Sequence, residues 1–161
     1  MKLSTQEEYG LRCLIQIGHH ERNTGNSITI SEISQAEGLS TANVGKLLRL
    51  LRMGNFIESV RGQAGGYKLA RTPAEISIAD VLTALGGRLF DPEFCEDHAG
   101  QEVFCTHSVN CSVRSLWNAI QFVVDQMLDR ITLQDLLGEE ITLKSELQQK
   151  AEELLQVAPA P

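Results

Sequence analysis

The feature that most constrains this 161-residue chain is a glycine-rich turn between two short runs of β-prone residues. Residues 56–60 read Phe-Ile-Glu-Ser-Val, residues 61–66 read Arg-Gly-Gln-Ala-Gly-Gly, and residues 67–70 read Tyr-Lys-Leu-Ala. Two such runs joined by a glycine-containing tip predict a β-hairpin. Long stretches on both sides have helical periodicity, so we expect the hairpin to be a small β element in a mainly α fold.

A first helix is predicted at the start of the chain. Ser4 and Glu7 have capping-box spacing, and an apolar stripe follows them as far as His19 and His20. A polar connection follows, and residues 28–30, Ile-Thr-Ile, form a short β-prone segment. Cys13 lies beside Leu14 in the first helix and is expected to be a buried apolar residue.

Two further helices, separated by a tight turn, precede the hairpin. The second helix is expected over residues 31–37 and ends at Gly38, where a left-handed residue is favoured. Ser40 caps a third helix over residues 41–53, whose inward stripe comprises Val44, Leu47, Leu48 and Leu51. A helix, a turn, a helix and a hairpin in this order form a winged helix-turn-helix pattern.

Charge separates the two parts of the chain. Residues 1–72 hold nine Lys/Arg against six Asp/Glu, whereas residues 73–161 hold five against fifteen. A basic first part suits a nucleic-acid partner, although charges on a helix are often only solvated surface. In the DNA reading, the third helix contributes base-edge and phosphate contacts and the hairpin approaches phosphates or the minor groove. The predicted DNA-binding residues are Thr41, Ala42, Asn43, Lys46, Arg49, Arg52, Arg61, Gly62, Gly65, Gly66, Tyr67 and Lys68.

The second part of the chain begins with a short helix from Ser77 that is closed by Gly86 and Gly87. A long helix follows residue 111, with a seam at spacings of three and four formed by Val113, Leu116, Ile120, Val123, Met127 and Ile131. A short helix restarts at Thr132, and a last helix covers residues 141–156. We therefore expect a DNA-binding domain (1–87), a cysteine-bearing loop (88–111), a dimerisation helix with a short following helix (112–137), and a C-terminal helix with a frayed tail (138–161).

Three cysteines, Cys95, Cys105 and Cys111, stand as C-x9-C-x5-C in the loop. The chain has no signal-peptide pattern and no apolar run of membrane-spanning length, so we expect a cytoplasmic protein with no membrane partner. Cytosolic thiols stay reduced, which favours metal or redox ligands over disulfides. Thiolates select zinc, copper(I) or iron-sulfur clusters, and the long spacers suit a cluster better than zinc.

These residues carry a resemblance to a known family. The start Met1-Lys2-Leu3-Ser4-Thr5, the stretch from Ser59 to Arg71 with its Arg-Gly-x-x-Gly-Gly-Tyr motif, and residues 76–81 resemble the IscR/NsrR family of bacterial winged-helix transcription regulators. The resemblance runs from residue 1 to about residue 137. It implies a homodimer on a palindromic operator, with the long helix as the dimerisation helix. The family often has Tyr-Leu-Glu where this chain has Asn43-Val44-Gly45, so the operator sequence does not carry over.

The resemblance also implies a [2Fe-2S] or [4Fe-4S] cluster held by Cys95, Cys105 and Cys111. Some members use a His three residues after the third cysteine, but Arg114 occupies that position here. Others use an acidic residue near the start of the first helix, which points to Glu8, since Glu7 has a capping role. His98 and His107 are the alternatives for the fourth ligand.

The sequence therefore predicts a dimeric DNA-binding transcription regulator, expected to act as a repressor. Through its cluster it would sense cluster status, iron, nitric oxide or redox state. The alternatives are a cluster-free regulator that depends on thiols or zinc, and a small iron-sulfur or protein-interaction module without DNA binding. An enzyme is not expected, because the chain lacks a phosphate-binding loop, a nucleophile elbow and a His-Glu-x-x-His motif.

Overall fold

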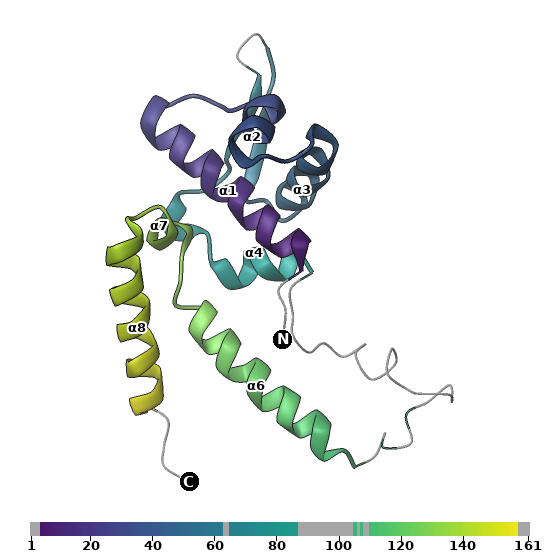
Figure 1. Ribbon diagram of the computed structural model, residues 1–161, viewed down its shortest axis with the longest axis vertical. Coiled ribbons are helices and arrows are strands. Elements are labelled where there is room, and N and C mark those ends of the chain that lie inside the picture. Colours follow the sequence, from purple (N-terminus) through teal and green to yellow (C-terminus); the bar gives the residue numbers. More distant parts are fainter. Residues whose placement is uncertain (1–3, 63–64, 87–104, 106, 108–109, 158–161) are drawn as a thin grey trace.

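A computed structural model describes residues 4–62, 65–86, 105, 107 and 110–157. A body that contains α1, several shorter helices and one hairpin forms one end of the molecule, and helices α6 and α8 extend from it (Figure 1). The elements, in chain order, are α1 (Thr5–Thr24), α2 (Ile30–Glu37), α3 (Thr41–Met53), β1 (Ile57–Val60), β2 (Gly66–Leu69), the 3-10 helix η1 (Pro73–Glu75), α4 (Ile78–Ala84), α6 (Ser112–Leu128), α7 (Leu133–Leu136) and α8 (Glu140–Val157). The mainly α fold with one small hairpin is confirmed.

Local capping sets the ends of the first three helices. The Ser4–Glu7 capping box is present, and α1 continues one turn beyond His20 until Gly25, at φ 70°, ends it. Thr29 forms a second capping box with Glu32, so α2 begins at Ile30. The prediction of a β-prone segment through residue 30 was therefore wrong at its end, because a capping threonine redirects the chain into a helix. The predicted bounds of α3 are confirmed.

The hairpin is joined to the helical body through its second strand. β1 and β2 pair antiparallel with Ile57 opposite Leu69 and Val60 opposite Gly66. Ile28 exchanges two backbone hydrogen bonds with Tyr67, of 2.8 and 3.0 Å. A side chain at position 66 would place its Cβ 2.5 Å from the Ile28 carbonyl oxygen. Glycine is therefore required at this position for the hairpin to lie against residue 28.

One hydrophobic core holds the body together. Its fully enclosed side chains come from α1, α2, α3, the hairpin, α4 and α7. The predicted inward stripe of α3 is confirmed, since all four of its members are buried. Cys13 is completely buried in the same core, as expected. Arg12 links α1 to α2, because its guanidinium donates to the Glu37 carboxylate at 2.8 Å and to the Glu37 carbonyl oxygen at 3.0 Å.

The chain after α6 returns to this core. The Ile78 amide donates to the Ile131 carbonyl oxygen at 3.0 Å, and the Leu133 amide donates to the Ile76 carbonyl oxygen at 2.9 Å. Leu133 and Leu137 are buried among the residues of the body. The prediction that Ile131 extends the seam of the long helix was wrong, because α6 ends at Leu128 and Ile131 is buried beyond it.

Helix α8 stabilises the corner between α6 and α7, residues 129–137, through a second set of contacts. Lys150 of α8 donates to the Arg130 carbonyl oxygen at 2.9 Å and forms an ion pair with Asp135 at 3.1 Å. Asp135 also accepts from the Thr132 amide at 2.8 Å, which caps α7. α8 therefore fixes the junction between α6 and α7. None of the described helices is long and apolar enough to cross a membrane.

Candidate nucleic-acid interface

Helix α3 has two chemically distinct faces. Its inner face packs in the core, while Lys46, Arg49 and Arg52 are exposed on its outer side. The Ser40 side chain accepts a hydrogen bond from the Asn43 amide at 3.2 Å and so fixes the start of the helix. Thr41 and Ala42 are exposed beside this cap, and Asn43 is half-buried. The arrangement presents small and polar residues at the helix start and cations along its length, which suits entry into a major groove.

Gly62 and Gly65 are needed for the turn of the hairpin, whether or not they contact DNA. Gly62 adopts φ 109°, a conformation that L side chains rarely adopt. The Gly65 amide donates to the Gly62 carbonyl oxygen at 2.9 Å and closes the turn. That amide is therefore used within the hairpin, whereas the Arg61 side chain is exposed next to the turn.

Lys68 is the second cation of the hairpin, and it has a partner. Its ammonium lies 3.0 Å from the Glu58 carboxylate on the neighbouring strand. This hydrogen bond and the charge of Glu58 raise the pKa of Lys68 above its usual value. Both side chains remain about half exposed. Figure 1 shows α3 and the hairpin in the body from whose other end α6 and α8 extend.

Two of the three loop cysteines lie within the described residues. Cys105 and Cys111 are free thiols of intermediate exposure, whereas Cys95 lies outside the described part, as does His98. Cys111 is the N-cap residue of α6, and its Sγ accepts from the Arg114 amide at 3.3 Å. His107 is exposed. Among the described residues, no three His, Cys, Asp or Glu side chains lie close enough together to hold a metal ion.

The acidic residues at the start of α1 differ in the way that the sequence predicted. Glu7 is buried, and its carboxylate accepts from the Ser4 amide in the capping box. Glu8 is exposed, and its negative charge acts on the guanidinium of Arg12, while no hydrogen bond to its carboxylate is seen among the described residues. Cys13 contrasts with the loop thiols, since burial, followed by the charge of Glu37, raises the pKa of its thiol to about 12. Cys13 is therefore a neutral core thiol.

Comparison with known proteins identifies the family. The profile of Rrf2, described as an iron-dependent transcriptional regulator, matches residues 3–139. The chain belongs to the Rrf2 family. Protein rrf2 of Nitratidesulfovibrio vulgaris is 32% identical over 137 residues, which cover 85% of this chain and 87% of that protein.

Solved structures agree with this membership of the Rrf2 family. T. potens IscR is 29% identical, with a TM-score of 0.66 over 85% of this chain and 86% of its own. CymR, the global cysteine regulator of B. subtilis, is 28% identical, with a TM-score of 0.65 over 85% of this chain and 96% of its own. The protein is thus a DNA-binding transcriptional regulator of the Rrf2 family and not an enzyme. Helix α8 follows the last residue that the family profile matches.

Sequence reasoning missed two residues that fix the arrangement of the elements. Ile28 holds the second hairpin strand through its backbone, and only its β-prone neighbours hinted at this pairing. Lys150 braces the corner after α6, and no local pattern indicates a contact between residues 15 to 20 positions apart. Both contacts are long-range and come from the tertiary fold.

Proposed function

We propose that this Rrf2-family protein binds a palindromic operator as a homodimer, with α3 in the major groove and the hairpin on the flanking backbone. The observation that carries the proposal is the division of α3 into a fully buried apolar face and an exposed basic face. A helix that only covered the core could carry charges of either sign on its solvated face, whereas every charged residue of α3 is a cation, as phosphate contacts require. The contact residues are the twelve predicted from the sequence, from Thr41 to Lys68.

Dimerisation is assigned to α6. Val113, Leu116 and Val123 are each more than half exposed on this helix, at 59%, 55% and 51%. Large apolar side chains gathered on one helix mark a contact with another protein surface. A second copy is the occupant that matches a two-fold operator, because a two-fold interface uses the same patch on both subunits.

The proposed sensor is the cysteine segment, with Cys95, Cys105 and Cys111 as ligands of an iron-sulfur cluster. The donor set fits, since Cys105 and Cys111 are free and accessible and thiolates are the usual ligands of such clusters. Glu8 is the proposed fourth ligand, with His98 or His107 as alternatives, because its carboxylate is exposed and is not used in a cap. When bound, the cluster supplies iron-sulfur bonds that respond to iron supply, nitric oxide and oxidants.

Cys111 connects the sensor to the dimer helix. Its sulfur caps α6 by accepting the Arg114 amide, so a change in the bonding of that sulfur changes the first turn of the helix. We infer that this cap transmits the state of the loop to the dimer and hence to the spacing of the two recognition helices. Gain or loss of the cluster would in this way change the affinity of the protein for its operator.

A second candidate is a regulator that uses the same thiols, or zinc, without a cluster. The similarity to CymR, whose name describes a cysteine regulator, favours it over a module that does not bind DNA. Both candidates share the DNA interface and differ only in what Cys105 and Cys111 carry. They are therefore separated by the chemistry of the purified protein.

The test of the sensor is anaerobic purification followed by absorption and electron paramagnetic resonance spectroscopy. Visible bands with iron and sulfide are expected in the wild type and in Cys13→Ala, and their loss is expected in Cys105→Ala. Cys13→Ala is a matched control because it removes the buried thiol. A colourless protein after anaerobic reconstitution would refute the cluster and leave the thiol or zinc regulator.

The DNA interface is tested separately. An operator is selected from random duplexes with the wild-type protein, and binding is then measured over a range of salt concentrations. Lys46→Ala is expected to weaken binding, because one phosphate contact is lost. The slope of the logarithm of the binding constant against the logarithm of the salt concentration should become smaller by about one. Lys144→Ala, which removes an exposed lysine from α8, is the control and should leave both unchanged. Equal effects of the two substitutions would contradict the assignment of α3.

A further inference from the structure

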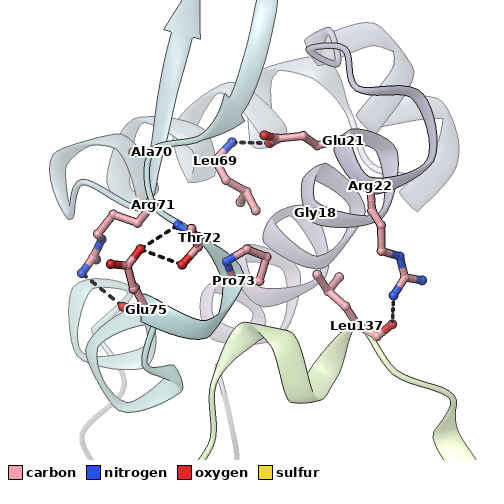
Figure 2. Close-up of a pocket in the computed structure, with 10 residues that line it drawn as sticks. All are labelled: Gly18, Glu21, Arg22, Leu69, Ala70, Arg71, Thr72, Pro73, Glu75 and Leu137. Carbon is pink, nitrogen blue, oxygen red and sulfur yellow. Dashed lines mark hydrogen bonds between the residues drawn. The ribbon is translucent and has the colours of Figure 1, made fainter.

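A cavity of about 620 Å³ lies where the end of α1, the chain after β2 and the end of α7 meet (Figure 2). Its walls are mainly apolar and are formed by Gly18, Leu69, Ala70, Pro73 and Leu137, with charged side chains between them. The volume falls within the range of small-molecule sites in proteins. Its lining residues include none of the proposed cluster ligands and none of the twelve proposed DNA contacts, so neither the proposed sensor nor the DNA interface accounts for it.

Two consecutive residues of α1 hold the cavity open. The Glu21 carboxylate accepts a hydrogen bond from the Leu69 amide at 2.8 Å, which ties α1 to β2. The Arg22 guanidinium donates to the Leu137 carbonyl oxygen at 2.8 Å, which ties α1 to the end of α7. Figure 2 shows these two bonds on different sides of the space. These two hydrogen bonds therefore fix the relative positions of α1, β2 and α7 around the cavity.

The charges around the cavity are not equivalent. Arg71 donates to the Asn55 carbonyl oxygen at 3.2 Å, and its guanidinium lies 5.2 Å from the centre of the Phe56 ring, outside the cavity. Arg22 likewise contacts His19, which is not a lining residue, at 3.4 Å. Arg71 also donates to the carbonyl oxygen of the lining residue Glu75, at 3.4 Å, so the head groups of both lining arginines are bound to backbone carbonyl oxygens.

The carboxylates differ from each other as well. Glu75 is exposed, and its carboxylate caps η1 by accepting from the Thr72 amide at 3.1 Å and from the Thr72 hydroxyl at 2.6 Å. In each carboxylate only one oxygen has a hydrogen bond within the described part of the chain, but Glu21 is half-buried whereas Glu75 is exposed. Glu21 thus places an acceptor with a full negative charge, and with a free oxygen, beside apolar walls.

We propose that this cavity is a binding site for a small organic cation, an ammonium group carried on an apolar body. The apolar body would lie against Leu69, Pro73 and Leu137, and the ammonium group would donate to the free oxygen of Glu21. An anionic ligand is disfavoured because Glu21 would repel it, while both guanidinium groups already donate to backbone carbonyl oxygens. Because Leu137 belongs to the corner that carries α6, an occupied site would also stabilise the attachment of that corner to α1.

The test compares three probes of one shape on the full chain: 4-phenylbutylamine, 4-phenylbutanol and 4-phenylbutyrate. Binding is followed by amide chemical shifts in nuclear magnetic resonance spectra. The amine is expected to bind saturably and to shift the amides of residues 18–22 and 69–72. The alcohol should bind about tenfold more weakly, as the loss of one charge-assisted hydrogen bond implies, and the acid should bind more weakly still.

Two variants locate the site. Glu21→Gln keeps an oxygen for the Leu69 amide but removes the charge, and it should weaken amine binding about tenfold. Glu75→Gln is the matched control and should bind like the wild type. Ala70→Leu, which fills the cavity and leaves Glu21 in place, should abolish binding of all probes. The proposal is overturned if no probe saturates at millimolar concentration, if the three probes bind equally, or if Glu21→Gln and Ala70→Leu both bind the amine as the wild type does.

Discussion

Alanine at Gly45 is expected to stabilise the protein, whereas alanine at Gly38 is expected to destabilise it. At both positions an added Cβ would meet nothing within 4 Å, so packing plays no part in the difference. Gly45 lies inside α3, where glycine costs about 1 kcal/mol relative to alanine. Gly38 has φ 66°, where an L side chain costs about 1–2 kcal/mol, only partly offset by a less flexible unfolded chain.

The two free energies of unfolding should therefore move in opposite directions, with a separation of about 1–2.5 kcal/mol. Urea unfolding followed by circular dichroism at one fixed protein concentration measures both, because dimer formation would otherwise shift the midpoint. Shifts of the same sign in both variants would refute the reasoning, since it attributes the whole difference to backbone conformation.

Glycine at position 45 lowers the stability of α3, and no contact in the described structure requires a glycine there. We therefore infer that the reason lies in what this helix binds. Glycine is used where a backbone approaches a ligand closely, and on this helix the proposed ligand is DNA. We therefore expect Gly45→Ala to be more stable and yet to bind the selected operator about tenfold more weakly, the cost of one misplaced methyl group in a packed interface. Unchanged affinity would show that the glycine has no role in DNA binding.

Three further outcomes are expected. Leu133→Ala, in a fully buried side chain, should lower the free energy of unfolding by about 2–5 kcal/mol in a denaturant titration, and a loss below about 1 kcal/mol would contradict the docking of α7 in the core. Burial alone raises the pKa of Asp135, but hydrogen bonds from Thr132 and Lys150 outweigh it and lower that pKa overall. The wild type should therefore have a larger free energy of unfolding than Asp135→Asn at neutral pH. This difference should disappear as the pH falls below the ordinary pKa of aspartate and through the lowered pKa of Asp135, as unfolding measured at a series of acid pH values would show. A difference that does not depend on pH would argue against it. In the folded protein without a cluster, iodoacetamide should modify Cys105 and leave Cys13 intact at pH 8, as mass spectrometry of the digest would show, and equal labelling would contradict the burial of Cys13.

Much of the fold could be predicted from the sequence because its signals are local. The capping residues Ser4 and Ser40 and the left-handed glycine Gly38 each act within four positions of the helix end that they define. The hairpin follows from residues 57–69 alone. The start of α2 was misplaced because two local signals overlap at Thr29, which is β-prone by type and a cap by position. Helix α8 also begins one residue earlier than predicted, at Glu140.

The corner after α6 could not be predicted in this way. The apolar spacing of three and four continues from Met127 to Ile131, so periodicity alone extends the helix. What ends it is the pairing of residues 131–133 with residues 76–78, which lie more than 50 positions earlier in the chain. The cavity was missed for the same reason, because Glu21 and Leu137 meet only in the folded protein.

The firm attachment of α6 has a geometric consequence for the choice of DNA. A 17-residue helix is about 25 Å long, and a tilt of about 10° at its anchored end displaces the far end by about 4 Å. That displacement exceeds the rise between neighbouring base pairs, about 3.4 Å. In the proposed dimer, the direction of α6 is set at one end, where Ile131 and Leu133 pair with Ile78 and Ile76. Substitutions in this pairing, although distant from the proposed DNA contacts, would therefore change the half-site separation that the protein selects.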